Sequence, residues 1–481
     1  MKRLVWLSLF WCSTSVAESR LEFRATEAVV PKPAVGGRLV VSIVPATETP
    51  RFTDVDAPFK PLFGIDVERL TADTVMTLDG ATSFPAGKRL VDLPPGDYKL
   101  QAVFLWNRNL LLPNAPGNLH SAVLKYRHDP LAKEPTVVVL DAVYPEPKAP
   151  AKPGVKLHEI PSKLLSAFHG RPMVYRVGVV LPDGFDANGN TTYPLVVHIG
   201  GFGQRFTSAG RMKPDARFVQ VLLDGAGPFG DPYQVNSANN GPYGDAFTTE
   251  VLPFLEATYR GSGKRFTAGG STGGWSSLAL QVFYPDVFDG CWSQCPDGVD
   301  FRAFQLADLT KDKNLYVNRF GFERPARRTL EGDTVYTVRH EAQLEKVLGR
   351  GGRWELGGQQ WASWNAVYGP KGDDGLPKPL WNGATGNVDA SVLKHWQKYD
   401  LRLQLETDWK RLGPKLAGKI HIWVGDADDY FLNNGVHRLK QSLAERTDPK
   451  FDGIIEIAPR RGHESGWSTA RVLDEMAERL K

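Results

Sequence analysis

The sequence predicts an α/β protein with a mostly parallel central sheet, preceded by an all-β sandwich domain. Beyond residue 155, near-continuous apolar strands alternate with segments whose apolar residues recur at helical spacing, as in parallel sheets covered by helices on both faces. Before residue 144, short apolar strands lie between Pro- and Gly-rich turns, which favours a β-sandwich. With 42% hydrophobic and 23% charged residues in 481, the composition excludes long disorder and coiled coil.

The first seventeen residues are typical of an export signal. Lys2 and Arg3 precede a short apolar run over residues 4–12, and the small residues Ser15 and Ala17 follow it. This order of a basic, an apolar and a small-residue segment predicts a signal peptide over residues 1–17, cleaved after Ala17. The apolar run is too short to span a bilayer. We therefore expect a secreted or periplasmic protein without stable membrane insertion.

Residues 18–144 are expected to form the β-sandwich, with strands at residues 38–44, 99–106 and 136–140. Residues 145–154 then contain four prolines, at positions 145, 147, 150 and 153. Proline resists both helix and sheet, so this stretch predicts a semi-rigid linker. A second domain is expected over residues 155–481.

The second domain shows alternating strand and helix patterns. Strands are predicted at residues 174–181, 193–199, 218–223, 419–424 and 453–458, with helices at 245–259 and 275–283. More than a hundred residues separate a short strand near residue 290 from the strand at 419. One crossover helix needs far fewer, so residues from about 300 to 415 are expected to be an insertion. It holds six of the thirteen tryptophans, which would form its own core or line a pocket.

A G-x-S-x-G motif lies between a short strand and a helix composed of small residues. Its members are Gly269, Gly270, Ser271, Thr272 and Gly273. In this context the serine occupies a sharp strand-to-helix turn that leaves space only for small neighbours and exposes the hydroxyl. The alternative is a glycine-rich turn with an idle serine. The flanking strand and helix favour Ser271 as a nucleophile.

A serine nucleophile needs a histidine base that is oriented by an acid. His463 follows a strand and a glycine, whereas His437 lies in a probable helix, so His463 is the predicted base. Asp428 follows the preceding strand and is the predicted acid, with Asp426 and Asp429 as rivals. This aspartate cluster lacks the spacing of a calcium-binding loop, and no metal or cofactor is expected.

The oxyanion hole requires two backbone N–H groups. Thr272, directly after the serine, is the first predicted donor. The second is expected from the glycine-rich turn after the strand at residues 193–199, where Gly201 and Phe202 are the candidates. His198 in the same stretch is interpreted as a structural residue at the strand end.

Charge and cysteine content restrict the partners. Lys and Arg number 58 against 54 Asp and Glu, a formal charge of +4, which does not favour a nucleic-acid partner. Cleavage of the signal would leave Cys291 and Cys295. A straight strand would hold these two beyond disulfide reach, so a bridge would require the chain to turn between them, and their pairing stays open.

Residues from about 162 to 481 resemble the putative-esterase branch of the α/β-hydrolase superfamily, which includes feruloyl and enterochelin esterases and mycolyltransferase-like enzymes. The resemblance is carried by residues 193–201, 240–246, 269–274, 425–428 and 462–463. It implies an α/β-hydrolase fold and a triad of Ser271, His463 and Asp428. The sequence after His198 departs from the His-Gly of many relatives, which leaves the second oxyanion donor open. An immunoglobulin-like β domain before the hydrolase domain is likewise similar to enterochelin-esterase architecture.

The predicted function is that of an exported serine esterase that cleaves a carboxylic ester through an acyl-enzyme. The expected substrate is a small-molecule or carbohydrate-linked ester. An acyltransferase or a serine peptidase would use the same three residues. A catalytically inert carbohydrate-binding protein is the alternative from a different class. The natural substrate and the oligomeric state are not specified by the sequence.

Overall fold

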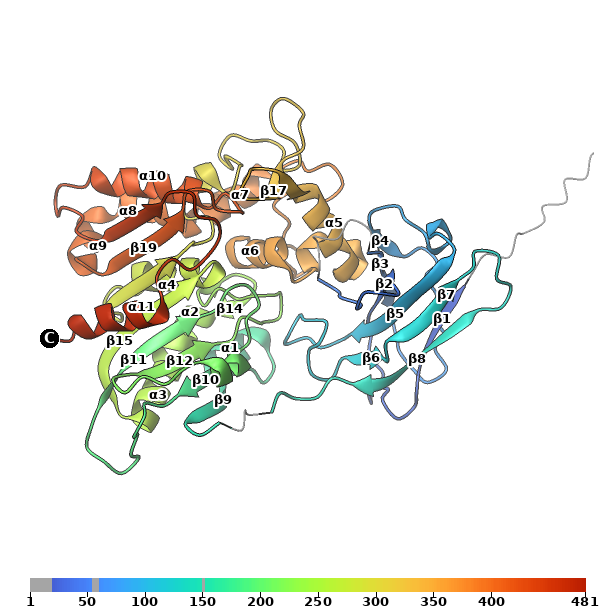
Figure 1. Ribbon diagram of the computed structural model, residues 1–481, viewed down its shortest axis with the longest axis horizontal. Coiled ribbons are helices and arrows are strands. Elements are labelled where there is room, and N and C mark those ends of the chain that lie inside the picture. Colours follow the sequence, from blue (N-terminus) through green and yellow to red (C-terminus); the bar gives the residue numbers. More distant parts are fainter. Residues whose placement is uncertain (1–19, 54–59, 149–151) are drawn as a thin grey trace, which may run out of the picture.

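The computed structural model describes residues 20–53, 60–148 and 152–481. The predicted signal peptide lies outside the described residues, as do positions 149–151 of the predicted linker. Figure 1 shows an N-terminal β sheet on one side, a second sheet with helices on the other, and helices of the insertion between them. No helix in the described part of the chain is long and apolar enough to cross a bilayer.

Eight strands form one hydrogen-bonded sheet over residues 21–143, here called the N-terminal β region. They are β1 Leu21–Ala25, β2 Gly37–Pro45, β3 Leu62–Val67, β4 Thr82–Phe84, β5 Gly96–Leu105, β6 Leu119–Ser121, β7 Leu124–His128 and β8 Thr136–Val143. Their order is β1-β8-β6-β5-β2-β3-β4, with β7 also paired to β5. A bridge between Phe23 and Met76 brings the β1 edge to the segment before β4, so the sheet folds over its own core. The predicted strands near residues 38, 99 and 136 are confirmed.

Strand β2 is buried on both faces, and the two faces have different partners. Leu39 and Val41 point into the core of the N-terminal β region. Val40, between them, joins a second apolar cluster that contains residues of the insertion. Successive side chains of a strand alternate between faces, so β2 connects the two packing layers.

The second sheet also has eight strands and confirms the mixed α/β class. Its strands are β9 Val155–Pro161, β10 Val174–Val180, β11 Tyr193–Ile199, β12 Val219–Leu223, β15 Gly261–Gly270, β16 Gly290–Gln294, β19 Ile420–Gly425 and β20 Ile454–Ala458. The order is β20-β19-β16-β15-β11-β12-β10-β9. The six strands from β20 to β12 pair in parallel. Strands β10 and β9 are antiparallel at one edge, because the chain turns back through α1 (Lys163–His169).

Apolar side chains cover both faces of this sheet. In β11, Val196 belongs to one buried cluster, whereas Leu195 and Val197 belong to another. The covering helices are α2 Tyr243–Ala246, a π-helical turn Phe247–Val251, α3 Leu252–Tyr259, α4 Thr272–Phe283, α10 Asn433–Ala444 and α11 Thr469–Glu478. Burial on both faces explains the continuous apolar strands of the sequence.

The segment between β16 and β19 contains two short strands and five helices. These are β17 Pro325–Arg328, β18 Thr334–Thr337, α5 Val338–Leu348, α6 Gln360–Tyr368, α7 Ala390–Trp396, α8 Leu401–Thr407 and α9 Trp409–Leu416. Outside this segment, a small strand pair precedes α2 and consists of β13 Asn236–Ser237 and β14 Gly241–Pro242. The six tryptophans of the segment are buried, and the Trp354 and Trp381 rings stack with centroids 3.7 Å apart. They belong to the buried cluster that also covers one face of the central sheet, so the core predicted for this segment is continuous with that of the sheet, and Trp364 also lines a cavity.

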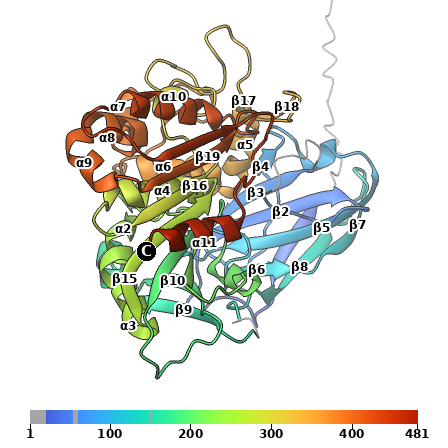
Figure 2. The same cartoon turned by 60° about the vertical axis from the view of Figure 1, so that its left-hand side comes forward.

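Helix α5 packs directly on the N-terminal β region. The Arg38 guanidinium donates a 2.6 Å hydrogen bond to the Val347 carbonyl and forms a 2.8 Å ion pair with Asp66. A Cβ at Gly64 would lie 2.2 Å from the same carbonyl, so only glycine allows this approach. Figure 2 shows α5 beside β3 and β4 from a second angle. The contact fixes one helix of the insertion against the N-terminal sheet.

Truncation of Leu348 should weaken this contact. The side chain is 3% exposed and packs with Val40, Leu62 and Val103, so Leu348→Ala should lower the free energy of unfolding by about 2–5 kcal/mol. Urea-induced unfolding followed by tryptophan fluorescence measures the loss. Leu330→Ala is the matched control because Leu330 is 54% exposed; equal losses in the two variants would contradict the packing described here.

Candidate active site

The loops that follow five parallel strands meet at one edge of the central sheet. Strands β11, β15, β16, β19 and β20 run in the same direction, so their carboxyl ends share that edge. Ligands of open α/β sheets bind outside the carboxyl ends of the strands. The candidate residues of the sequence, from Gly201 to His463, follow these strand ends.

Ser271 lies on the turn between β15 and α4 in an unusual backbone conformation. Its φ is 58° and its ψ is −124°, a region that side-chain-bearing residues rarely adopt. Helix α4 begins at the next residue, Thr272, so the serine precedes a helix N-terminus whose partial positive charge favours developing anions. The geometry agrees with that of a nucleophile at a strand-to-helix turn.

Close packing explains two of the three motif glycines but not the third. A Cβ at Gly273 would lie 2.0 Å from the Ile199 carbonyl oxygen, and one at Gly269 would lie 2.4 Å from the Gly273 carbonyl oxygen. At Gly270 the nearest heavy atoms would be 3.8 Å away, an ordinary contact distance. The sequence-based expectation that every neighbour must be small is therefore too broad.

Alanine at these positions should separate the two cases. Gly273→Ala forces a methyl group against backbone that cannot easily move and should cost about 1–3 kcal/mol of unfolding free energy. Gly270→Ala is the control and should cost less than about 1 kcal/mol. Urea-induced unfolding of both variants measures the difference, and a larger loss in Gly270→Ala would show that the turn is packed differently.

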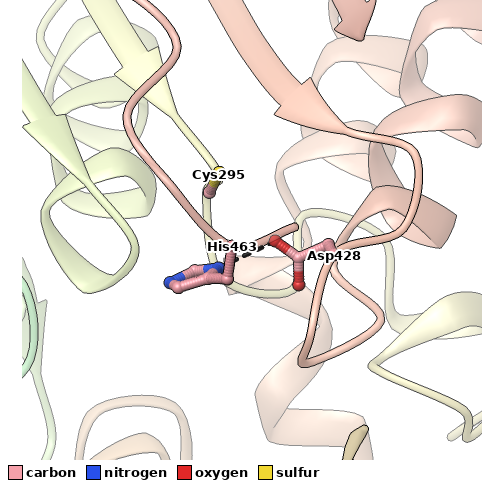
Figure 3. Close-up of side chains that lie close together, drawn as sticks. All are labelled: Cys295, Asp428 and His463. Atoms are coloured by element: carbon pink, nitrogen blue, oxygen red, sulfur yellow. Dashed lines mark hydrogen bonds and ion pairs between the residues drawn. The ribbon is translucent and has the colours of Figure 1, made fainter. Parts of the chain in front are cut away.

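His463 and Asp428 contact each other across the loops after β20 and β19. His463 Nδ1 lies 2.7 Å from Asp428 Oδ2, as Figure 3 shows. The other carboxylate oxygen of Asp428 accepts hydrogen bonds from the backbone N–H groups of Tyr430 at 2.9 Å and Leu432 at 3.2 Å. Asp428 is fully buried, so the carboxylate is fixed in position and holds the imidazole in one orientation.

The two rival aspartates accept hydrogen bonds from backbone N–H groups of the loops and not from the imidazole of His463. Asp426 Oδ1 accepts from the Arg460 N–H at 2.6 Å. Asp429 Oδ1 accepts from the backbone N–H of His463 at 2.9 Å. Of the three carboxylates, that of Asp428 is the one bonded to the imidazole. His437 lies in α10, as the sequence indicated.

Electrostatic contacts raise the pKa of His463. Burial lowers this pKa, but hydrogen bonds with Asp428 and with Cys295 raise it by more, so the pKa lies above its ordinary value.

Cys295 and Cys291 are both free thiols and do not form a bridge. Residues 291–294 lie in strand β16. The Cys295 thiol donates to the Glu464 carbonyl at 3.0 Å.

Cys295, Asp428 and His463 are also a set of potential metal ligands. One ligand atom from each lies within 4.8 Å of the others. However, the nitrogen and oxygen that face each other here are already joined by the hydrogen bond between His463 and Asp428. The arrangement therefore agrees better with an oriented imidazole than with a metal centre.

A cavity of about 300 Å³ contains both Ser271 and His463. Among the described residues, no hydrogen bond joins these two side chains, and such bonds are often long before substrate binds. A larger cavity of about 720 Å³ includes His198 and Gly269 but neither Ser271 nor His463. The smaller cavity is therefore the candidate active-site pocket.

Of the three predicted oxyanion donors, Phe202 lines this pocket, and Thr272 directly follows Ser271, which also lines it. Within the described part of the chain, the backbone N–H groups of Thr272, Gly201 and Phe202 donate no hydrogen bond to protein atoms. Phe202 lines the pocket with Ser271, whereas Gly201 does not. His198 is half-buried, and its Nε2 contacts Gln220 Oε1 at 3.0 Å. Loss of solvation lowers its pKa to about 4. This agrees with its interpretation as a structural residue.

Sequence reasoning missed much of the pocket lining. Asp297 follows β16, Arg327 lies in β17, Glu341 lies in α5, and Thr53 comes from the N-terminal β region. Trp364 of α6 is the one tryptophan of the pocket lining. None of these positions carries a motif. The signal in the sequence that could have identified Asp297 is its position three residues after the end of β16, at the strand edge where the predicted site residues lie.

Comparison with known families matches residues 172–447 to the family described as "Putative esterase". The match spans more than half of the chain. The chain belongs to this family. It is therefore a carboxylic ester hydrolase, and the resemblance noted in the sequence is confirmed. Ser271 and Asp428 lie within the matched residues, and His463 lies beyond them. No curated protein sequence matches the chain.

Solved structures with distant similarity include several hydrolases. FphF, a fluorophosphonate-binding serine hydrolase of Staphylococcus aureus, is 13% identical, with 68% of this chain and 98% of that chain covered at a TM-score of 0.40. An S-formylglutathione hydrolase from Agrobacterium tumefaciens is 14% identical, with coverages of 69% and 99% and a TM-score of 0.37. A ferulic acid esterase from Anaeromyces mucronatus is 13% identical, with coverages of 64% and 84% and a TM-score of 0.30. The family match, and not these structures, carries the assignment.

Proposed function

We propose that the protein is an exported serine esterase that hydrolyses its substrate through a triad of Ser271, His463 and Asp428. The observation that carries this proposal is the 300 Å³ pocket that contains Ser271 and His463, together with the 2.7 Å contact between His463 and Asp428. A nucleophile, a base and an orienting acid, on the loops that follow β15, β20 and β19 at one edge of the sheet, are the arrangement that acyl transfer requires.

In this mechanism the Ser271 hydroxyl attacks the ester carbonyl carbon while His463 Nε2 accepts its proton. Asp428 keeps the proton on Nδ1 and stabilises the imidazolium that forms. The oxyanion is bound by the N–H groups of Thr272 and Phe202, which we favour over Gly201 because Phe202 lines the pocket. His463 then protonates the leaving alkoxide, and water, activated by the same ring, releases the acid from Ser271.

Replacement of the nucleophile should abolish turnover. Ser271→Ala removes the attacking oxygen and should lower kcat/KM for p-nitrophenyl acetate by about a thousandfold or more. A fluorophosphonate probe with mass spectrometry identifies the labelled residue in the wild type. Labelling at another serine, or turnover that persists in the variant, would remove Ser271 from the mechanism.

The pH dependence should report the raised pKa of His463. The base must be neutral in the free enzyme, so kcat/KM should rise with pH through a midpoint above the ordinary histidine value of 6.5. Asp428→Asn removes the carboxylate that raises this pKa, so the midpoint should shift to lower pH, and kcat should fall by roughly 10³–10⁴-fold. Rates measured from about pH 5 to pH 11 test both effects. An unchanged midpoint in the variant would contradict the assigned acid.

We also propose the domain organisation that the sequence predicts. The parallel core of the central sheet and its helices support an α/β-hydrolase domain over residues 155–481. The folded-over sheet of the N-terminal β region supports an immunoglobulin-like sandwich over residues 18–144. Export rests on the basic, apolar and small-residue order of residues 1–17 alone.

A further inference from the structure

Asp297 is a buried carboxylate in the wall of the candidate pocket. It is 2% exposed and lines the same cavity as Ser271 and His463. Its backbone N–H donates to the Ser271 carbonyl at 3.4 Å, so it lies next to the proposed nucleophile. The proposed triad and oxyanion hole do not use this side chain.

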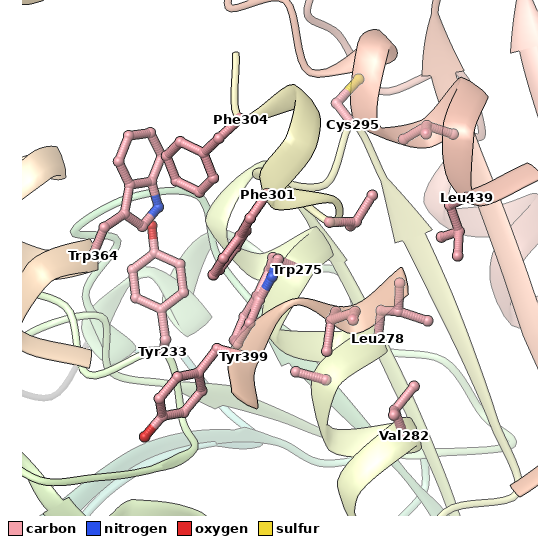
Figure 4. Packing of buried hydrophobic residues seen from close by; sticks show 14 of the residues in the cluster. Tyr233, Trp275, Leu278, Val282, Cys295, Phe301, Phe304, Trp364, Tyr399 and Leu439 are labelled. Atoms are coloured by element: carbon pink, nitrogen blue, oxygen red, sulfur yellow. The ribbon is translucent and has the colours of Figure 1, made fainter. Parts of the chain in front are cut away.

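Hydrogen bonds occupy one oxygen of Asp297 and leave the other. Oδ2 accepts from the Tyr233 hydroxyl at 2.6 Å. It also accepts from Trp364 Nε1 and from Thr272 Oγ1, both at 3.1 Å. Figure 4 shows Tyr233 and Trp364 with their polar atoms directed toward each other. Among the described residues, no hydrogen bond reaches Oδ1, the oxygen left for a ligand in the pocket.

Asp297 forms no ion pair with an arginine or lysine in the described part of the chain, unlike other buried aspartates, and the cationic group that acts on it is His463 of the same pocket. Asp224 pairs with Arg205 at 2.6 Å, and Asp300 pairs with Arg402 at 2.9 Å. Burial raises the pKa of Asp297 above its ordinary value, although hydrogen bonds from Tyr233 and Trp364 oppose this. A buried charge without a partner is costly. The uncharged amide of an asparagine could accept the same three hydrogen bonds, so the structure alone does not require a carboxylate.

Arg327 and Glu341, the other charged side chains of the pocket besides His463, have partners elsewhere. Arg327 lies 3.8 Å from Asp429, with its guanidinium over the Tyr430 ring at 5.6 Å. Glu341, the second carboxylate of the lining, accepts from Trp361 Nε1 at 3.0 Å. The pocket around the proposed nucleophile thus has two carboxylates within an aromatic and amide wall.

We propose that Asp297 is a specificity-determining residue that binds a cationic group of the substrate beside the scissile ester. This inference rests on the proposed function, because it uses the same pocket. The Oδ1 atom would form a charge-assisted hydrogen bond or ion pair with the cation, and the aromatic ring of Trp364 would supply a favourable surface for positive charge.

The test compares cationic esters with neutral isosteres. The acyl pair is p-nitrophenyl p-guanidinobenzoate and p-nitrophenyl p-ureidobenzoate, and the alcohol pair is acetylthiocholine and its carbon analogue dimethylbutyl thioacetate. We expect the wild type to favour the cation in at least one pair by about tenfold or more in kcat/KM. Asp297→Asn should reduce that ratio to near one. No preference in either pair, or a preference unchanged in Asp297→Asn, would overturn the proposal.

Binding measurements separate this proposal from the triad. In Ser271→Ala protein, calorimetry should give a Kd for the cationic member about tenfold lower than for its isostere, and adding Asp297→Asn should remove the difference. This readout does not require turnover, so it can succeed or fail independently of the nucleophile assignment. Glu341→Gln is the matched control. If that variant, and not Asp297→Asn, removes the preference, the assignment to Asp297 is wrong.

Discussion

The close approach between the first turn of α4 and the end of β11 determines the geometry of the whole pocket. With Gly273 lacking a side chain, the helix lies against the Ile199 carbonyl, and this contact sets Ser271 and the loop from Gly200 to Phe202 side by side. A larger residue at position 273 would separate the serine from the oxyanion loop. The strained conformation of Ser271 (φ 58°) is held by backbone hydrogen bonds on both sides, because its N–H donates to the Gln294 carbonyl at 2.9 Å and its carbonyl accepts from the Trp275 N–H at 3.0 Å.

Helix α5 connects this strand-edge site to the N-terminal β region. One face of the helix packs on β2 through Val347 and Leu348. On another face, Glu345 accepts hydrogen bonds from the N–H groups of Trp361 and Ala362, both at 2.8 Å, and so fixes the start of α6. Because α6 carries Trp364, a displacement of the N-terminal sheet would move α5, then α6, and so the wall of the pocket. The N-terminal β region is thus part of the support of the site.

A residue of the site could be predicted from the sequence where a short sequence pattern marks it, and could not where contacts with distant segments place it. Strands such as residues 193–199 could be predicted because burial on both faces leaves a continuous apolar run. Ser271 and His463 could be selected because a strand-to-helix turn and a strand-end loop have short-range signatures. The choice of Asp428 over Asp426 and Asp429 depends on which carboxylate meets a ring 35 residues further along the chain, so the sequence left it open. Asp297 follows β16, but no motif or periodicity marks it as part of the pocket. Thr53 joins the pocket through the position of the N-terminal β region, which no periodicity encodes.

The position of Asp297 has a consequence for the chemistry itself. Thr272 contributes its backbone N–H to the proposed oxyanion hole, while its hydroxyl donates to Asp297. The imidazolium of His463, whose charge also acts on Asp297, balances this carboxylate while the oxyanion forms. A substrate cation seated on Asp297 would be bound before the attack as well as during it. Uniform binding of that kind lowers KM without raising kcat, so discrimination by this residue should appear mainly in KM and in Kd, and less in turnover.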